Sequence, residues 1–432
     1  MHQRILPTVL AYSAVAAYAV VCLAGCGGGS DDPPPNVVIT STGTNAVSYW
    51  NDVAGKTVIA TSATSTTPEE LRSNYALDVA TVQLAVYDAA SAIDGRYRPY
   101  AVTPAAPAAG ASMDAAIAAA AYGTLRVLFP NRSAQYQAAY DSFVGAIPAG
   151  DARSKGLALG AEVAAGIVAL RANDGRAVVL APYVPGTGPG QFRGVNPVNR
   201  FAPSVKPFAL TSNGQFRPAP PPALGSDAYA TSFNEVKAFG GAVSTVRTAA
   251  QLEAARFHTE PPGPLWTRNL LRFATSTTDV AEAARLMAFI YVVQADASDA
   301  CFEAKYFYQA WRPLSAIPLA DTATNPATVS DPTWVPVLAT PNHPEYPAAH
   351  SCASGSLAQT LRLYYGTQEV AFSMDSTVTG TTRSYATTNA LPDEIASARV
   401  WSGIHFRFST DAGAQLGVQV ADWTWAHYFG RR

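Results

Sequence analysis

Between Asp279 and Trp311 the chain contains neither proline nor glycine, and Pro313 follows shortly afterwards. Such a stretch favours one long helix, which ends where proline removes a backbone donor and clashes with the preceding turn. Further runs place apolar residues, many of them alanines, at helical spacing: 77–93, 115–129, 152–175, 226–239, 248–258, 350–365 and 410–428. No convincing run of alternating strand residues is present, so we predict an all-α fold of helical bundles.

The segment 182–225 interrupts this helical pattern and holds many of the 32 prolines. Its aromatic residues argue against a free linker, so we expect long, ordered Pro-rich loops that cover the bundles. The "GTGPG" within it lacks a following Lys-Ser/Thr and has no preceding strand. It therefore favours backbone turns over a phosphate-binding loop.

The chain has 432 residues, of which 14% are charged, and a formal net charge of -2. This length allows one large core or two merged cores. A near-neutral chain gives no electrostatic reason to expect nucleic acid as a partner. Any site for an anion must therefore come from a local cluster of cationic side chains.

The first 25 residues have the three-part pattern of a signal peptide, with a short basic start, an apolar stretch and the ending "LAGC". The ending resembles a bacterial lipobox, in which Cys26 becomes the lipidated first residue. Residues 26–45 then read as a flexible tether, followed by a single domain over 46–432. This pattern predicts an exported protein anchored by lipid, in the outer membrane and facing the periplasm. A transmembrane anchor is the alternative, since the apolar length permits one.

Lys305 and Arg312 are seven residues apart in the long helical run. At about 100° per residue, seven steps return a helix to within roughly 20° of its start, so both cations are predicted to share one face. Their neighbours are aromatic: Tyr306, Phe307, Tyr308 and Trp311. An apolar face with two cations indicates an anionic partner. The alternative is surface charge with the aliphatic stems lying on the core.

The stretch "HPEYPAAHS" holds two of the six histidines, His343 and His350. Pro347 favours a helix start, so His350 is expected in the first turn of a helix. Free N–H groups and the helix dipole attract an anion there and lower the pKa of an imidazole. A histidine in that place can act as an acid or a base near neutral pH. The alternative is a solvent-facing side chain.

Arg399 and His405 are six residues apart, about 240° around a continuous helix. They can share a site only if the chain breaks between them, and Gly403 offers that break. Ser409 or Thr410 would then cap the last helix. Together, the three segments supply three cations and two histidines, a set that can hold a tetrahedral oxyanion.

The Lys-x6-Arg-Pro, Pro-x-x-His and Arg-x5-His patterns resemble the three motifs of the vanadium-dependent haloperoxidases and the related type 2 phosphatidic acid phosphatases. "VQLAVYDAASAI", "GTGPGQFRG" and "QFRPAPPPAL" also look like the bacterial haloperoxidase-like members. The resemblance covers about residues 46–432, with the motifs in 300–410. It implies a core of two related four-helix bundles.

The resemblance also assigns roles to the site residues. Lys305, Arg312 and Arg399 would bind vanadate or phosphate, and Lys305 would also be catalytic, by polarising the bound peroxide. His405 would bond to vanadium in a haloperoxidase or attack phosphorus in a phosphatase, and His350 would be the acid-base group. A histidine at the place of His343 is found in bromoperoxidase-type members, so bromide is expected over chloride; otherwise His343 is a turn residue.

This chain departs from the family pattern at two places. Ala348 and Ala349 stand where the family has Ser-Gly, so a hydroxyl that would bond to the anion is missing. One hydrogen bond to a charged group contributes about 1.5–3 kcal/mol, so affinity for vanadate is expected to be lower. Phe302 and Glu303 stand where the family has Trp-Asp.

We therefore expect a vanadate-dependent haloperoxidase that oxidises halide with hydrogen peroxide to hypohalous acid. The alternatives are an acid phosphatase that forms a phosphohistidine on a phosphate ester, and a lipid-anchored protein whose anion site has lost its activity. Membrane contact is expected only through the lipid anchor. The oligomeric state stays open.

Cys301 lies four residues before Lys305, and Cys352 two residues after His350. If both motifs meet at one anion, the two sulfurs are close, so we predict a Cys301–Cys352 disulfide in the exported protein. The alternative is two unrelated buried cysteines.

Overall fold

The computed structural model describes residues 36–40, 43–320 except 65–74, and 325–432. They lie in one compact unit. The predicted signal peptide and the lipidation site at Cys26 lie outside the described residues.

The helices of the first half are α1 (Ala46–Thr64), α3 (Tyr75–Asp94), α4 (Met113–Leu128), α5 (Ser133–Gly145) and α6 (Asp151–Arg171). Those of the second half are α7 (Asp227–Gly240), α8 (Ala249–Phe257), α9 (Pro262–Ala274), α10 (Val280–Tyr308), α11 (Pro313–Ala316), α12 (Ala349–Tyr365), α13 (Ala390–Trp401) and α14 (Arg407–His427). Short 3-10 turns lie at Pro130–Arg132 and Ala202–Ser204. The all-α prediction is confirmed, and the alanine-rich runs form α3, α4 and α6.

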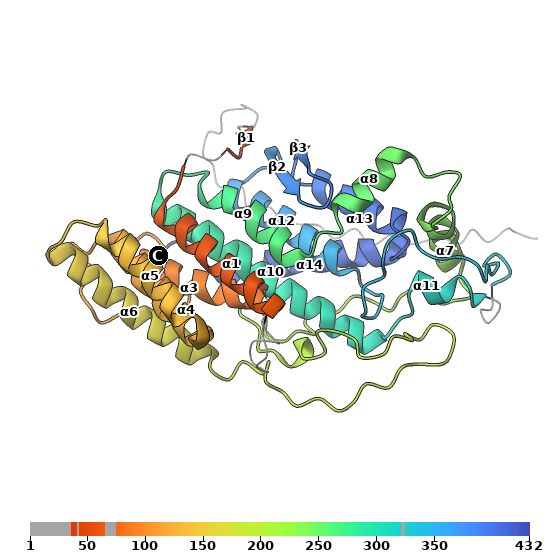
Figure 1. The fold of residues 1–432 in the computed structure, drawn as a ribbon, viewed down its shortest axis with the longest axis horizontal. Helices are drawn as coiled ribbons and strands as arrows, with labels where there is room; N and C mark the ends of the chain where they lie inside the picture. The colour runs from red at the N-terminus through yellow and green to blue at the C-terminus, as the bar shows by residue number, and fades with distance from the viewer. Residues whose placement is uncertain (1–35, 41–42, 65–74, 321–324) are drawn as a thin grey trace, which may run out of the picture. The chain divides into compact units, whose positions relative to one another are not determined.

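The long helix α10 connects the two groups of helices. It packs against α3 from the first half and against α12 and α14 from the second (Figure 1). Nearly every residue from Ala281 to Ala304 is buried, as a helix surrounded by others requires. Among the described helices, α3 is the one apolar and long enough to cross a membrane, but 89% of its apolar window is buried inside the fold.

A small sheet lies beside the helices, with the strand order β1 (Val37–Val38), β2 (Val370–Ser376), β3 (Thr381–Tyr385). β1 pairs parallel to β2, and β2 pairs antiparallel to β3. The sequence did not predict this sheet. The tether prediction is also wrong for Val37–Ile39, because Ile39 is buried and its N–H donates to the Ala371 carbonyl.

Helices α12 and α14 approach each other through glycines. A Cβ atom at Gly417 would overlap the Cys352 carbonyl oxygen, and one at Gly355 would overlap the backbone of Ala414. Only residues without side chains allow such close packing. This contact fixes α12, which carries His350, against α14, which follows directly after His405.

We predict that Gly417→Ala destabilises the protein by about 1–3 kcal/mol, because the added methyl group forces two helix backbones apart. Denaturant unfolding would measure the change. The matched control is Gly145→Ala in α5, where a Cβ meets no atom within 4 Å. That control should be neutral or stabilising by up to about 1 kcal/mol, since alanine has the higher helix propensity. Equal effects of the two variants would contradict the tight contact.

Candidate active site

Lys305 and Arg312 do not share a helix face, so that part of the sequence prediction is wrong. Helix α10 ends at Tyr308 because Gln309 adopts the left-handed conformation, with φ 48°. Ala310 then forms a bridge with Gln191 of the Pro-rich loop, and Arg312 lies just before α11. The chain therefore turns back, and it brings Arg312 to the site from a loop.

The other two motifs are placed as predicted. His350 lies in the first turn of α12, which starts at Ala349. Gly403, with φ 79°, breaks the chain between Arg399 in α13 and His405. The predicted cap was wrong, because Ser409 and Thr410 lie inside α14.

The residue before α14 is Phe406, whose backbone N–H donates to Glu345 Oε1 over 3.0 Å. A side chain 61 positions away therefore satisfies the donor next to the helix start.

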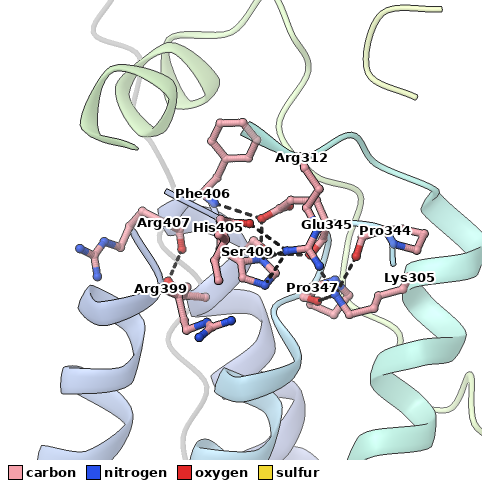
Figure 2. A network of polar contacts seen from close by, with 12 residues as sticks. Lys305, Arg312, Pro344, Glu345, Pro347, Arg399, His405, Phe406, Arg407 and Ser409 are labelled. Carbon is pink, nitrogen blue, oxygen red and sulfur yellow. Dashed lines mark hydrogen bonds and ion pairs between the residues drawn. The ribbon is translucent and has the colours of Figure 1, made fainter. Parts of the chain in front are cut away.

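Lys305 binds the loop of the second motif. Its Nζ donates to the carbonyl oxygens of Pro344 and Glu345, both at 2.9 Å, and to that of Pro347 (Figure 2). An ammonium group has three donors, so all three are used. Lys305 thus fixes the backbone path from Pro344 to Pro347, and it can contact an anion only by exchanging one carbonyl.

Arg312 joins two histidines. Its Nη1 lies 2.9 Å from His405 Nε2, and its Nη2 lies 2.9 Å from His343 Nδ1. Its Nε and Nη1 also donate to the carbonyls of His343 and Ile404. An oxyanion that bonds to His405 Nε2 therefore has to displace the guanidinium.

Glu345 orients His405 from the other side of the ring. Its Oε1 accepts from His405 Nδ1 over 2.8 Å, and the carboxylate is fully buried. Since arginine can only donate, Nε2 of His405 must be the acceptor toward Arg312, and the proton must sit on Nδ1. Sequence reasoning missed Glu345. The available signal was an acidic residue two positions before Pro347, in a loop already chosen for its histidines.

Arg399 and His350 form the second part of the site. Figure 2 shows the Arg399 guanidinium apart from the Arg312 and His405 pair. Its Nη1 donates to the His258 carbonyl over 3.0 Å. Arg399 Nε and His350 Nε2 are buried and have no hydrogen-bond partner among the described residues. Both residues line a cavity of about 470 Å³, together with His343.

Burial dominates the electrostatics of this cluster. It lowers the pKa of Lys305 to about 8, of Arg312 to about 10 and of Arg399 to about 9. Burial and then the nearby arginines hold the pKa of His405 and of His350 well below the usual range. Both rings are therefore neutral at pH 7, which leaves the Nε2 lone pair of His405 available.

These residues fit an oxyanion such as vanadate or phosphate. The site holds three buried cations, Lys305, Arg312 and Arg399, and one buried carboxylate, Glu345, whose charge acts on Lys305 and Arg312. A buried excess of positive charge is costly unless an anion compensates it. The Nε of Arg399, which has no partner among the described residues, can also donate a charge-assisted hydrogen bond to an oxygen of the anion.

The two cysteines meet but do not form the predicted disulfide. Cys301 and Cys352 are free, buried thiols, and Cys301 Sγ donates to the Pro347 carbonyl over 3.7 Å. Burial raises the pKa of Cys301, but the neighbouring Cys352 side chain and the charge of Lys305 outweigh that effect, so the net shift is downward. The prediction that the two sulfurs lie close is correct, and the prediction that they form a disulfide is wrong.

We predict that both thiols react with an alkylating agent when the purified chain is unfolded without a reductant. Peptide mass spectrometry would locate the label on Cys301 and Cys352. A linked peptide pair in place of the labels would contradict the structure.

Comparison with known proteins adds independent evidence. Residues 285–430 match the family described as the VCPO second helical-bundle domain. A crystal structure of a bacterial vanadium-dependent iodoperoxidase has a TM-score of 0.70 and 20% identity, over 90% of this chain and 99% of that one. This chain has the vanadium haloperoxidase fold. It shares that fold at 16% identity with apo and holo bacterial vanadium-dependent chloroperoxidases, at TM-scores of 0.65 and 0.67.

The apo and holo chloroperoxidase matches cover 84% and 90% of this chain, and 94% and 97% of theirs. Comparison with curated proteins gives no significant match. The resemblance found in the motifs is confirmed. The matched bundle domain, residues 285–430, contains every residue predicted for the haloperoxidase site, from Lys305 to His405.

Proposed function

We propose that this chain is a vanadate-dependent haloperoxidase that oxidises halide with hydrogen peroxide to hypohalous acid. One observation carries the proposal: His405, held at Nδ1 by Glu345, directs its Nε2 toward the buried Arg312 guanidinium. Bromide is the proposed halide, since His343 contacts Arg312 where the bromoperoxidase-type pattern has its histidine.

The roles follow from the contacts. Vanadate, when bound, supplies a Lewis-acid centre that activates peroxide toward halide. His405 would hold it through Nε2, with the imidazole kept in one tautomer by Glu345. Arg312 and Arg399 would donate to its oxygens, and Lys305 keeps the loop of Glu345 in place. His350, neutral and at the edge of the cavity, would move protons between the site and the substrate.

The Ala348–Ala349 replacement would weaken the site without removing it. Ala348 N–H donates to the Ser409 carbonyl, so this backbone is held by α14. Ser351 Oγ is buried and partnerless in the described part of the chain. Its Cβ faces Gly413 of α14, so it does not replace the missing hydroxyl.

A phosphatase is the second candidate, and the same Glu345–His405 pair favours it. An imidazole whose Nδ1 proton is held by a carboxylate is a suitable nucleophile through Nε2. His405 would then form the phosphohistidine, and His350 would protonate the leaving alcohol.

Two assays on the purified protein separate these functions. After loading with orthovanadate, peroxide-dependent bromination of a phenolic dye supports the haloperoxidase, with chloride and iodide tested in parallel. Hydrolysis of p-nitrophenyl phosphate that vanadate inhibits supports the phosphatase. If the protein shows neither activity and calorimetry detects no binding of vanadate, the anion site has lost its function.

We also propose that the protein is exported and anchored by lipid at Cys26. The support is the "LAGC" sequence followed by "GGGSDDPPP". Metabolic labelling with a radioactive fatty acid should mark the wild type and not Cys26→Ala. Equal labelling of both would contradict the anchor.

A further inference from the structure

Arg399 is the least constrained of the three cations at the anion site. Among the described residues, its guanidinium is held by one hydrogen bond, from Nη1 to the His258 carbonyl over 3.0 Å. Lys305 and Arg312 each donate to at least two backbone carbonyls. The direction of the Arg399 side chain therefore depends on where the His258 carbonyl lies.

His258 contacts helix α13 at two points. It follows the last residue of α8, so its carbonyl lies where that helix ends. Its ring is fully buried, and its Nε2 lies 2.7 Å from Glu394 Oε1. Glu394 and Arg399 both belong to α13. The ring thus binds one side chain of this helix, and the carbonyl of the same residue binds another.

The ring of His258 donates its proton to a carboxylate that is itself held in place. Burial raises the pKa of Glu394, but the hydrogen bond from His258 and the charge of Arg383 outweigh that effect, so the net shift is downward. An ionised carboxylate only accepts, so Nε2 of His258 must carry the proton. Glu394 also accepts from the Tyr385 hydroxyl at 2.9 Å and from Arg383 Nη1 at 2.5 Å.

We propose that His258 is a positioning residue, whose ring bond to Glu394 holds its carbonyl where that carbonyl directs the Arg399 guanidinium toward the anion. The inference rests on the proposed function, in which Arg399 donates to the vanadate oxygens. The residues that line the cavity include Thr259 and Glu260 but not His258. His258 therefore acts through Arg399 and does not touch the anion itself.

Two variants of His258 test the ring bond, with orthovanadate as the probe in calorimetry. His258→Phe keeps a buried ring and removes the donor, while Glu394 retains its other two partners. It should weaken orthovanadate binding about tenfold, the low end of the loss found for outer partners of metal ligands. His258→Gln places an amide donor at the reach of Nε2, so it should restore binding to near the wild-type value. His427→Phe, exposed on α14, is the matched control and should bind like the wild type.

A double-mutant cycle with Arg399→Ala separates positioning from a general loss of stability. Arg312 and His405 remain in that background to hold the anion, so its affinity stays measurable. If His258 acts through Arg399, His258→Phe should then cause no further loss of orthovanadate affinity. An equal loss in both backgrounds overturns the proposal, as does a His258→Gln variant that binds no better than His258→Phe.

Failure of the proposed function would give a different result. If the cycle is non-additive but no halide is oxidised, the haloperoxidase function fails and the positioning role stands. If His258→Phe binds orthovanadate like the wild type and bromide is oxidised, the positioning role fails and the haloperoxidase stands. A wild type that binds no orthovanadate overturns both.

Discussion

Replacing His405 with alanine is expected to lower both vanadate affinity and halide oxidation by more than about a hundredfold. Loss of an outer partner of a metal ligand already costs about 10–100-fold, and this change removes the ligand atom itself. His405 Nε2 is the acceptor nitrogen that Glu345 and Arg312 fix from two sides. The measurements are calorimetric titration with orthovanadate and peroxide-dependent bromination.

His427→Ala is the matched control for that variant. His427 lies at the end of the same helix, α14, where it is exposed and stacks on Trp423. It should bind vanadate and brominate like the wild type. Circular dichroism should show that both variants are folded. A folded His405→Ala protein with near wild-type bromination would remove the basis of the proposed function.

Glu345→Gln is expected to lower vanadate affinity or activity by about 10–100-fold, the range found for second partners of metal-binding histidines. The amide oxygen of glutamine can still accept from His405 Nδ1 and from the Phe406 N–H. The variant therefore keeps the two hydrogen bonds and removes the negative charge of Glu345. That charge makes His405 Nε2 a stronger electron-pair donor toward vanadate. Calorimetry and bromination rates would measure the loss.

The pH dependence separates this positioning role from a structural one. Burial raises the pKa of Glu345 to about 7 from its ordinary 4.5. Wild-type activity should fall as the pH drops through about 7 and the carboxylate gains a proton, and Glu345→Gln should lack this step. Stability should behave in the opposite way. The folded state holds a proton that the unfolded chain releases, so the wild-type free energy of unfolding falls as the pH rises from 4.5 to about 7.

Glu303→Gln is the control for Glu345→Gln, because it removes a different carboxylate from the same half of the protein. Glu303 is half-buried on α10 and pairs with Arg217, and it makes no hydrogen bond or ion pair with His405 in the described part of the chain. Its loss should change stability by at most about 1 kcal/mol and leave the pH profile of activity as it was. The same shift in both variants would assign the effect to general electrostatics.

Long periodic runs made much of the fold predictable. Alanine-rich segments such as 77–93 and 115–129 can bury a helix on several sides, and they form α3 and α4. The break at Gly403 was also predictable, since glycine tolerates the positive φ needed there. The spacing of the three motifs identified the cations and histidines that gather at the site.

Other features depend on tertiary contacts that no local pattern contains. Gln309 ends α10 early because the Pro-rich loop pairs with the next residue, which moves Arg312 off the helix. β2 alternates buried and half-buried residues, but its small and polar members hid the strand pattern. Glu345 gained its role only when the fold placed it against His405, 60 positions later.

Lys305 and Arg312 donate hydrogen bonds to backbone carbonyl oxygens of the chain itself. A polar cluster that satisfies its own donors keeps its form whether or not an anion is present. The protein should thus mature in vanadium-poor medium and be activated afterwards by dialysis against orthovanadate. The speed of that activation would report how fast Arg312 leaves His405, rather than any refolding of the bundles.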